Sequence, residues 1–141
     1  MTKKQFLFDS NSIYELIRET PQKALDKLME GTTISLAYYE LGNALWRESL
    51  LLKRISFEEA EKALDLMYLI LKNMQVPRPE NEAEGQTLQI AHRFNLTFYD
   101  SAYLVEAKRA GKVLVTNDNK LAKTAGKLGV ETLPSNALMY H

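Results

Sequence analysis

The chain has 141 residues, a length that favours one domain over residues 1–141 rather than two. It has no cysteine and only two histidines, which excludes disulfides, thiolate zinc sites and a cysteine nucleophile; any metal must be bound mainly by oxygen, as magnesium and manganese prefer. Lysine plus arginine equals aspartate plus glutamate at 18 each, so no strong net charge attracts nucleic acid, although basic residues can still cluster on one face.

The first predicted elements alternate between strand and helix. Residues 6–8 are a short aromatic run that predicts a buried strand, and an amphipathic helix follows it. Pro21 begins a second, shorter helix, which we expect Gly31 to end. Residues 32–36 predict a second strand, and residues 37–52 predict the helix that follows it.

The middle of the chain is predicted to be helical. Ser56 is placed to cap a long amphipathic helix, and Pro77 is expected to break it. Residues 75–76 are candidates for a brief edge strand before that break. Residues 80–94 then predict another helix.

The last third of the chain returns to the alternating pattern. In the helix at 80–94 we expect Leu88 and Ala91 to face inward. The remaining predicted elements are a helix at 99–111, a strand at 112–115, a helix from 118 to 126 or 129, and a strand at 130–133. Strands that alternate with helices predict an α/β fold, a three-layer α/β/α sandwich with a central, mostly parallel sheet.

Three aspartates fall where such a sheet binds ligands. Asp9 closes the first strand, and Asp118 lies just beyond the strand at 112–115. Asp100 stands at the predicted start of a helix, which we expect to project towards the same edge. Open parallel sheets bind ligands outside the carboxyl ends of their strands, so we expect these three carboxylates to lie close together.

Glu40 is predicted to face inward from its helix. Its neighbours three and four residues away are mainly apolar, with Leu36, Ala37 and Ala44 among them. An inward carboxylate is costly unless a positive group pairs with it. We therefore add Glu40 to the three aspartates as a candidate ligand.

Each acid also has a simpler interpretation. Asp9, Asp100 and Asp118 each stand where a helix N-cap is expected, and the Glu40 side chain can bend outward to solvent. The four together need a common counter-charge, and no lysine or arginine is obviously placed to serve them all. A divalent cation, magnesium or manganese, is the simplest candidate.

Four sequence segments around these acids resemble the motifs of PIN domains, in the same order. LFDSNSIYELI carries Asp9, SLAYYELGNAL carries Glu40, LTFYDSAYLVEAKRAG carries Asp100 and VLVTNDNKLAKTAGKLGV carries Asp118. The resemblance covers about residues 5–133 and is greatest to the VapC-type toxins of toxin–antitoxin pairs. Asn119 departs from the pattern, because some members carry a further acid there, and this leaves the number of bound metals open.

The resemblance implies divalent-metal-dependent cleavage of RNA phosphodiester bonds by a three-layer α/β/α domain. It also implies a small VapB-like antitoxin partner and a homodimer. Four small polar residues flank the acids and are candidates for orienting the carboxylates or contacting phosphate; they are Ser10, Asn11, Thr116 and Asn117. Turn formation and helix capping are their alternative roles.

Two other classes of α/β protein fit this sequence less well. A phosphatase of the haloacid-dehalogenase type would need a second acid two residues after Asp9, where this chain has Asn11, and no set of residues fits a receiver domain. A non-catalytic PIN-like module that binds RNA or protein stays open as an alternative. The chain has no apolar run long enough for a membrane span and no signal-like start, so we expect a cytoplasmic protein without membrane attachment.

Overall fold

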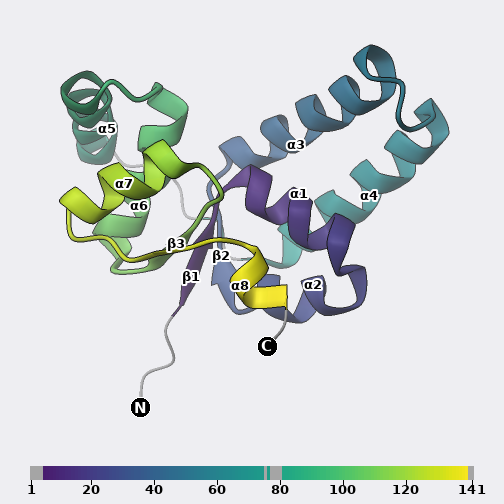
Figure 1. Cartoon of the computed structure of the whole chain (residues 1–141), viewed down its shortest axis with the longest axis horizontal. Coiled ribbons are helices and arrows are strands. Elements are labelled where there is room, and N and C mark those ends of the chain that lie inside the picture. The colour runs from purple at the N-terminus through teal and green to yellow at the C-terminus, as the bar shows by residue number, and fades with distance from the viewer. Residues whose placement is uncertain (1–4, 75, 77–80, 140–141) are drawn as a thin grey trace.

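A parallel sheet with helices on both faces forms the centre of the fold (Figure 1). The computed structural model describes residues 5–74, 76 and 81–139, and for 81–84 it describes the backbone only. Its elements in chain order are β1 Phe6–Phe8, α1 Ser10–Glu19, α2 Pro21–Leu28, β2 Gly31–Thr32, α3 Leu36–Trp46, the π-helix η1 Arg47–Leu51, α4 Phe57–Asn73, α5 Asn81–Phe94, α6 Phe98–Ala110, β3 Val113–Val115, α7 Asn119–Lys127, β4 Thr132–Leu133 and α8 Asn136–Met139.

The order of the strands creates a switch point at the middle of the sheet. The order is β2-β1-β3-β4, and every pairing is parallel. The chain leaves β1 to form β2 on one side and later returns to form β3 on the other. In register, Phe8 of β1 lies opposite Val115 of β3, so both strands end at the same level. Ligand sites in open α/β sheets lie outside such strand ends.

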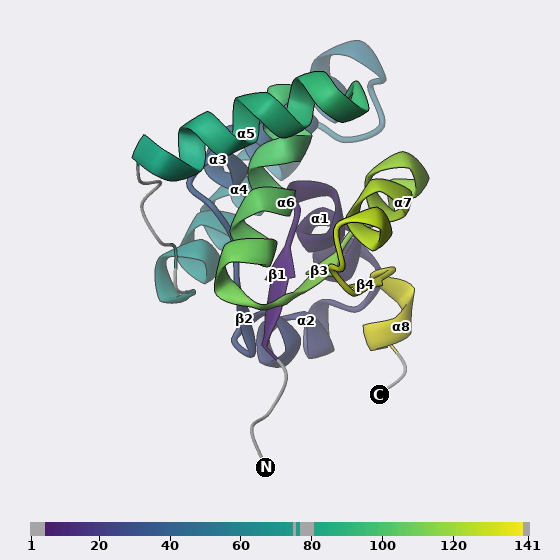
Figure 2. The same ribbon diagram turned by 90° about the vertical axis from the view of Figure 1, so that its left-hand side faces the viewer.

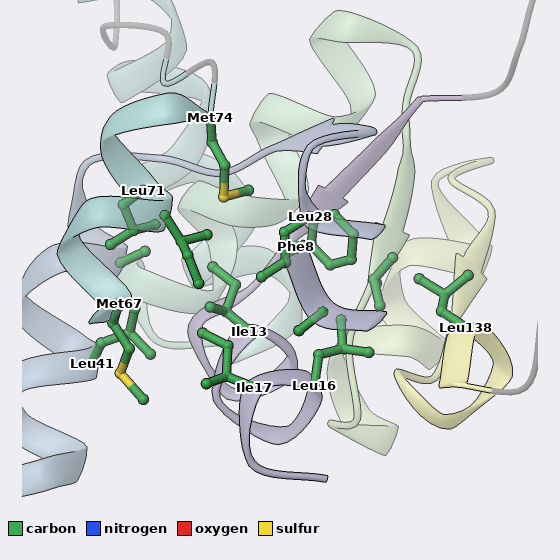
Figure 3. Packing of buried hydrophobic residues seen from close by; sticks show 14 of the residues in the cluster. Phe8, Ile13, Leu16, Ile17, Leu28, Leu41, Met67, Leu71, Met74 and Leu138 are labelled. Carbon is green, nitrogen blue, oxygen red and sulfur yellow. The ribbon is translucent and has the colours of Figure 1, made fainter. Parts of the chain in front are cut away.

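Two hydrophobic clusters cover the two faces of the sheet. Phe8 and Val115 point to the face covered by α1, α2, α3, α4 and α8. Figure 3 shows how the buried residues of this cluster pack. Leu7 and Leu114 point to the opposite face, which α6 and α7 cover. Helix α5 packs against the outer side of α6 (Figure 2). This arrangement confirms the predicted three-layer α/β/α fold.

The second predicted strand is much shorter than residues 32–36. Strand β2 contains Gly31 and Thr32, so Gly31 begins a strand instead of ending helix α2. The Thr33 hydroxyl donates to the Phe8 carbonyl at 2.7 Å, and Ala37 N donates to the carbonyl of Ile34, which turns the chain into α3. Apolar character at 34–36 therefore reflects packing in a turn and a first helical turn.

Two helical predictions and one strand prediction in the middle of the chain need correction. The helix predicted at 37–52 is α3 followed by the π-helix η1. Leu88 is 54% exposed while Ala91 is buried, because the inward stripe of α5 runs through Thr87 and Ala91, four residues apart. Val76 forms no strand. Gln75, the other residue of the edge strand predicted there, lies outside the described residues, as does Pro77.

The final strand is also shorter than predicted. Strand β4 contains Thr132 and Leu133, whereas Val130 is buried in the turn after α7. A short helix, α8, follows it and was not predicted. Among the described helices, none is long and apolar enough to cross a membrane.

Candidate functional site

A cavity of about 390 Å³ lies at the carboxyl ends of β1 and β3. All four acids selected from the sequence line it, although they come from segments far apart in the chain. The complete lining is Asp9, Ser10, Asn11, Glu40, Asp100, Tyr103, Asn117 and Asp118. Of the four small polar residues predicted around the acids, Thr116 is absent from this lining, and its contacts are described next.

Asp9 is the most buried of the four acids, with 8% of its surface exposed. It caps helix α1, because its Oδ1 accepts a hydrogen bond from the Ser12 backbone N–H at 2.9 Å. Burial raises the pKa of Asp9; hydrogen bonds from Thr116 and Ser12 lower it in part, and the charge of Asp118 raises it further. The ionised side chain is therefore unfavourable in this setting, and a bound cation would stabilise it.

Thr116, which is buried next to the cavity residues, connects two of the acids. Its hydroxyl is hydrogen-bonded to the Asp9 carboxylate, and its Oγ1 accepts the backbone N–H of Asp118 at 3.1 Å. Thr116 is buried, so it has no exposed surface with which to contact a substrate. The bond from Asp118 N is the turn contact that the alternative interpretation of Thr116 expects, and the bond to Asp9 is compatible with the orientation of a carboxylate.

Ser12 was not predicted as a site residue, yet it fixes the position of Asp9. Its hydroxyl donates to the Val115 carbonyl at 2.9 Å, and its side chain is fully buried. Together with the bond from Asp9 N to the same carbonyl at 3.2 Å, this contact attaches the start of α1 to the end of β3. Its position in the first turn of α1 is the only signal in the sequence.

Glu40 is oriented by two hydroxyl groups. Its Oε1 accepts hydrogen bonds from Tyr103 at 2.7 Å and from Ser10 at 3.2 Å. Tyr103 is 1% exposed, and burial together with the nearby Glu40 charge raises its pKa, so its hydroxyl remains a donor. Within the described residues, Oε2 of Glu40 receives no hydrogen bond and is available to a ligand. Tyr103 was also missed, although it lies three residues after Asp100 on the same helix.

Asp118 and Asp100 stand at the starts of two helices. Asp118 caps α7, because its Oδ1 accepts the Leu121 N–H at 2.9 Å. Asp100 is not a cap: Thr97 caps α6, and its Oγ1 accepts the Asp100 N–H at 3.0 Å. The capping alternative therefore holds for Asp9 and Asp118 and is wrong for Asp100.

The electrostatic environment of Asp100 shows that the acids influence one another. Burial is the largest cause that raises its pKa, followed by the charges of Asp118 and Asp9. A hydrogen bond from Thr97 and the charge of Lys120 lower it in part. The mutual repulsion of these carboxylates is what a divalent cation would remove.

Asn117 and Asn11 lie at the exposed rim of the cavity. The Asn117 amide donates to Asn11 Oδ1 at 3.1 Å and to Ser135 Oγ at 2.9 Å, and its Oδ1 accepts the Ser135 N–H at 2.9 Å. These bonds join the start of α1, the loop after β3 and the loop after β4. Ser135 had no signal in the sequence, since its partner lies 18 residues away in a loop.

The donor set fits a hard divalent cation. All four candidate ligands are carboxylates, and in the described part of the chain none of them forms an ion pair with lysine or arginine. As the side chains stand, no three acidic or histidine side chains among the described residues are grouped to hold a metal ion. Oxygen chemistry and uncompensated charge thus fit magnesium or manganese, and binding would require the carboxylates to move together.

Comparison with known proteins identifies the family of the chain. The family model described as "PIN domain" matches residues 6–127, which is most of the chain and includes all four acids. The chain belongs to the PIN-domain family. Its four acids therefore lie within the part of the chain that the family model covers.

The relatives of this PIN-domain chain are nucleases of the VapC type. It is 36% identical over 132 residues to "Exonuclease VapC9" of Pyrobaculum aerophilum, covering 92% of each chain. It is 30% identical over 107 residues to "Ribonuclease VapC3" of the same organism, covering 74% of this chain and 79% of that one. The two names state different activities, so the comparison supports a VapC-family nuclease without specifying its reaction.

A solved structure shares the fold of this PIN domain. It is PAE2754 from Pyrobaculum aerophilum, with a TM-score of 0.78 and 26% sequence identity. The match covers 96% of this chain and 94% of that one. Nearly all of both chains thus follows one architecture.

Proposed function

We propose that this PIN-domain protein is a divalent-metal-dependent endoribonuclease that hydrolyses RNA phosphodiester bonds as the toxin of a type II toxin–antitoxin pair. One observation carries the proposal: four carboxylates from distant segments line one cavity at the switch point of the sheet. Within the described residues no basic side chain neutralises them by an ion pair. Helix capping explains the positions of Asp9 and Asp118, but it does not explain why four acids without an ion pair line one cavity.

The cavity residues divide the chemical tasks among them. A magnesium or manganese ion bound here would supply charge neutralisation at phosphorus and a stronger nucleophile. Asp9 and Asp100 are the proposed direct ligands, with Asp118 binding directly or through water. Glu40, whose Oε1 is already engaged, presents Oε2 to orient the attacking water. Thr116 holds the Asp9 carboxylate in place.

Neutral substitutions of the acids test the proposal. Asp9→Asn and Asp100→Asn should each reduce cleavage of a mixed RNA substrate by about 100-fold or more, because even the partners that support metal ligands contribute 10–100-fold. Asp65→Asn, an exposed acid on α4, is the matched control and should cleave at the wild-type rate. Full cleavage by both cavity variants, or cleavage that chelation of divalent metal does not stop, would remove the proposed mechanism.

The name of one relative favours a second candidate activity, exonucleolytic cleavage. A circular RNA distinguishes the two, because it has no end for an exonuclease to use. The endonuclease proposal predicts that wild-type protein with magnesium linearises the circle and that Asp100→Asn does not. A circle that stays intact while linear RNA of the same sequence is degraded from one end would assign exonuclease activity instead.

The proposed partners are a second copy of the chain and a small antitoxin. Helices α3 and α4 extend from the body as an arm (Figure 1). Trp46, Leu50 and Phe57 are large apolar residues exposed on it, and they line a cavity of about 390 Å³. Light scattering should give twice the chain mass of 16.1 kDa, and Leu50→Asp should reduce association. A monomer at all concentrations would contradict the dimer proposal.

A further inference from the structure

A second cavity continues from the acid cavity and has a different character. It has a volume of about 420 Å³ and shares Ser10, Asn11 and Glu40 with the acid cavity. Its lining residues come from α1 on one side and from α3, η1 and the loop after η1 on the other. The rest of its lining includes Tyr14 and five charged residues, which are Glu15, Arg18, Arg47, Glu48 and Arg54.

Helical spacing places arginines at the far end of this groove. On α3 and η1, Glu40 and Arg47 are seven residues apart on one stripe, and on α1, Ser10 and Arg18 are eight residues apart. Both spacings are about two helical turns, or roughly 10–12 Å along the axis. The Ser10 hydroxyl bonds Glu40 at 3.2 Å, so the two stripes start together at the acids and each ends at a guanidinium.

Arg47 is the guanidinium that is available to a ligand. In the described part of the chain it forms no ion pair, whereas Arg54 pairs with Glu48 at 3.3 Å and Arg18 pairs with Glu19 at 3.0 Å. Glu15 and Glu48 also line the groove, so its wall is mixed in charge rather than uniformly basic. Such a wall suits one anionic group bound at a defined place.

The half-buried Tyr14 adds a neutral donor to the same wall. Burial and the charge of Glu48 raise its pKa, so the phenol keeps its proton at neutral pH. Arginine binds phosphate through two parallel hydrogen bonds, and a phenol can donate a third. The groove therefore combines the donors that recognise a phosphodiester with a direct path to the acids.

We propose that this groove binds the nucleotide next to the cleaved bond, with its phosphate on Arg47. The inference rests on the proposed nuclease function. It adds the side on which the RNA strand leaves the acid cavity. The strand runs from the acids along α1 and α3 towards η1. Binding therefore requires at least one nucleotide beyond the scissile phosphate on that side.

Kinetics of Arg47→Gln test the groove. We expect KM for a single-stranded oligoribonucleotide to rise about tenfold, as for the loss of a hydrogen bond to a charged group, while kcat stays within about twofold. Arg47→Lys should restore part of the affinity, because it keeps the charge and loses the paired geometry. Arg93→Gln, on α5 outside both cavities, makes the same change of charge and should leave KM unchanged.

Salt dependence separates a phosphate contact from a structural effect. The logarithm of affinity for single strands falls with the logarithm of salt by about 0.7 for each phosphate contact. We expect Arg47→Gln to reduce this slope by about that amount and Arg93→Gln to leave it unchanged. Fluorescence anisotropy with a labelled oligoribonucleotide measures this salt slope. All of these proteins also carry Asp100→Asn, so that the RNA is not cleaved during the measurement.

The outcomes distinguish this inference from the proposed function. If wild-type protein cleaves no RNA but Arg47→Gln still weakens binding and flattens the salt slope, the groove stands and the nuclease proposal fails. If wild-type protein cleaves RNA and Arg47→Gln and Arg47→Lys both keep the wild-type KM and slope, the groove is overturned. Loss of binding to a protein partner with unchanged RNA affinity would likewise overturn it and assign Arg47 to that partner.

Discussion

The hydroxyl groups of Tyr103 and Ser10 both donate to Oε1 of Glu40, so it is Oε2 that can face a ligand. Tyr103→Phe removes one of the two hydroxyl groups and leaves the ring in place. We expect cleavage to fall by about tenfold, since partners that orient ligands typically contribute 10–100-fold. The free energy of unfolding should fall by about 1 kcal/mol for the lost hydrogen bond. Single-turnover cleavage and urea unfolding measure the two effects.

Tyr68→Phe is the matched control for this variant. The Tyr68 hydroxyl donates to the Tyr38 carbonyl at 2.9 Å, away from the acid cavity. The free energy of unfolding of Tyr68→Phe should fall by a similar amount, and its rate of RNA cleavage should equal that of the wild type. Equal cleavage by the two variants would show that Tyr103 has only a structural role.

The raised pKa of Asp9 predicts how stability varies with pH. A carboxyl with a higher pKa in the folded protein binds more protons when folded, so the free energy of unfolding rises as pH falls through that pKa towards the ordinary value of 3.8. Asp9→Asn removes the buried charge and keeps a residue that caps well. Without metal at neutral pH, it should raise Tm by roughly 3 °C, and the gain should shrink as pH falls.

Melting curves with chelator between pH 7.5 and 4.5 check this prediction. Asp65→Asn, which changes an exposed charge on α4, serves as the control and should show no gain that shrinks in this way. A difference between Asp9→Asn and wild type that stays constant with pH, or a lower Tm at neutral pH, would contradict a buried, uncompensated Asp9 charge.

Single residues were predictable where local position carried the signal. Asp9 and Asp118 follow apolar strands, and their placement at the cavity matches that position. Ser12 and Tyr103 were missed because their partners are distant, the Val115 carbonyl 103 residues from Ser12 and Glu40 63 residues from Tyr103. A pattern within one helix cannot indicate a hydrogen bond to another segment.

At the scale of elements, Gly31 is required by the close pairing of β2 with β1. A Cβ added there would lie 2.5 Å from the Phe6 carbonyl oxygen and 2.6 Å from the ring of Phe8. Gly31→Ala should therefore lower the free energy of unfolding by about 1–3 kcal/mol, as overpacking typically does. Urea unfolding gives this value.

Gly85 provides the opposite case in α5. No described atom lies within 4 Å of a Cβ built there, so Gly85→Ala should raise the free energy of unfolding by about 0.5–1 kcal/mol through helix propensity. A Gly31→Ala variant that is as stable as the wild type, or more stable, would show that the close approach at Gly31 does not limit packing.

Elements were predictable where capping and periodicity agreed. Ser56 begins α4 with a capping box to Glu59, and α6 ends at Gly111 in the left-handed conformation, as both sequence signals indicate. The strand predicted at 32–36 failed because apolar residues there pack from a turn and a helix. Periodicity does not distinguish these cases when the run is only five residues long.

At the scale of the whole molecule, strand order brings the acids together. Asp9 and the loop of Asn117 and Asp118 meet because β3 returns to the free side of β1. Alternating strands and helices predicted a parallel sheet, but no local pattern states which strand lies beside which. Helix α3 then adds Glu40 and helix α6 adds Asp100, and the hydrogen bond from Tyr103 of α6 to Glu40 links the two helices.

The proposed nuclease activity depends on a divalent cation bound by these four carboxylates. Crystals of the wild-type protein soaked in millimolar manganese test it most directly, read by anomalous difference density. We expect a peak in the acid cavity with oxygens of Asp9 and Asp100 within roughly 2.5 Å, and no peak in Asp100→Asn crystals treated in the same way. No peak in the wild-type cavity, or a peak only elsewhere, would contradict it.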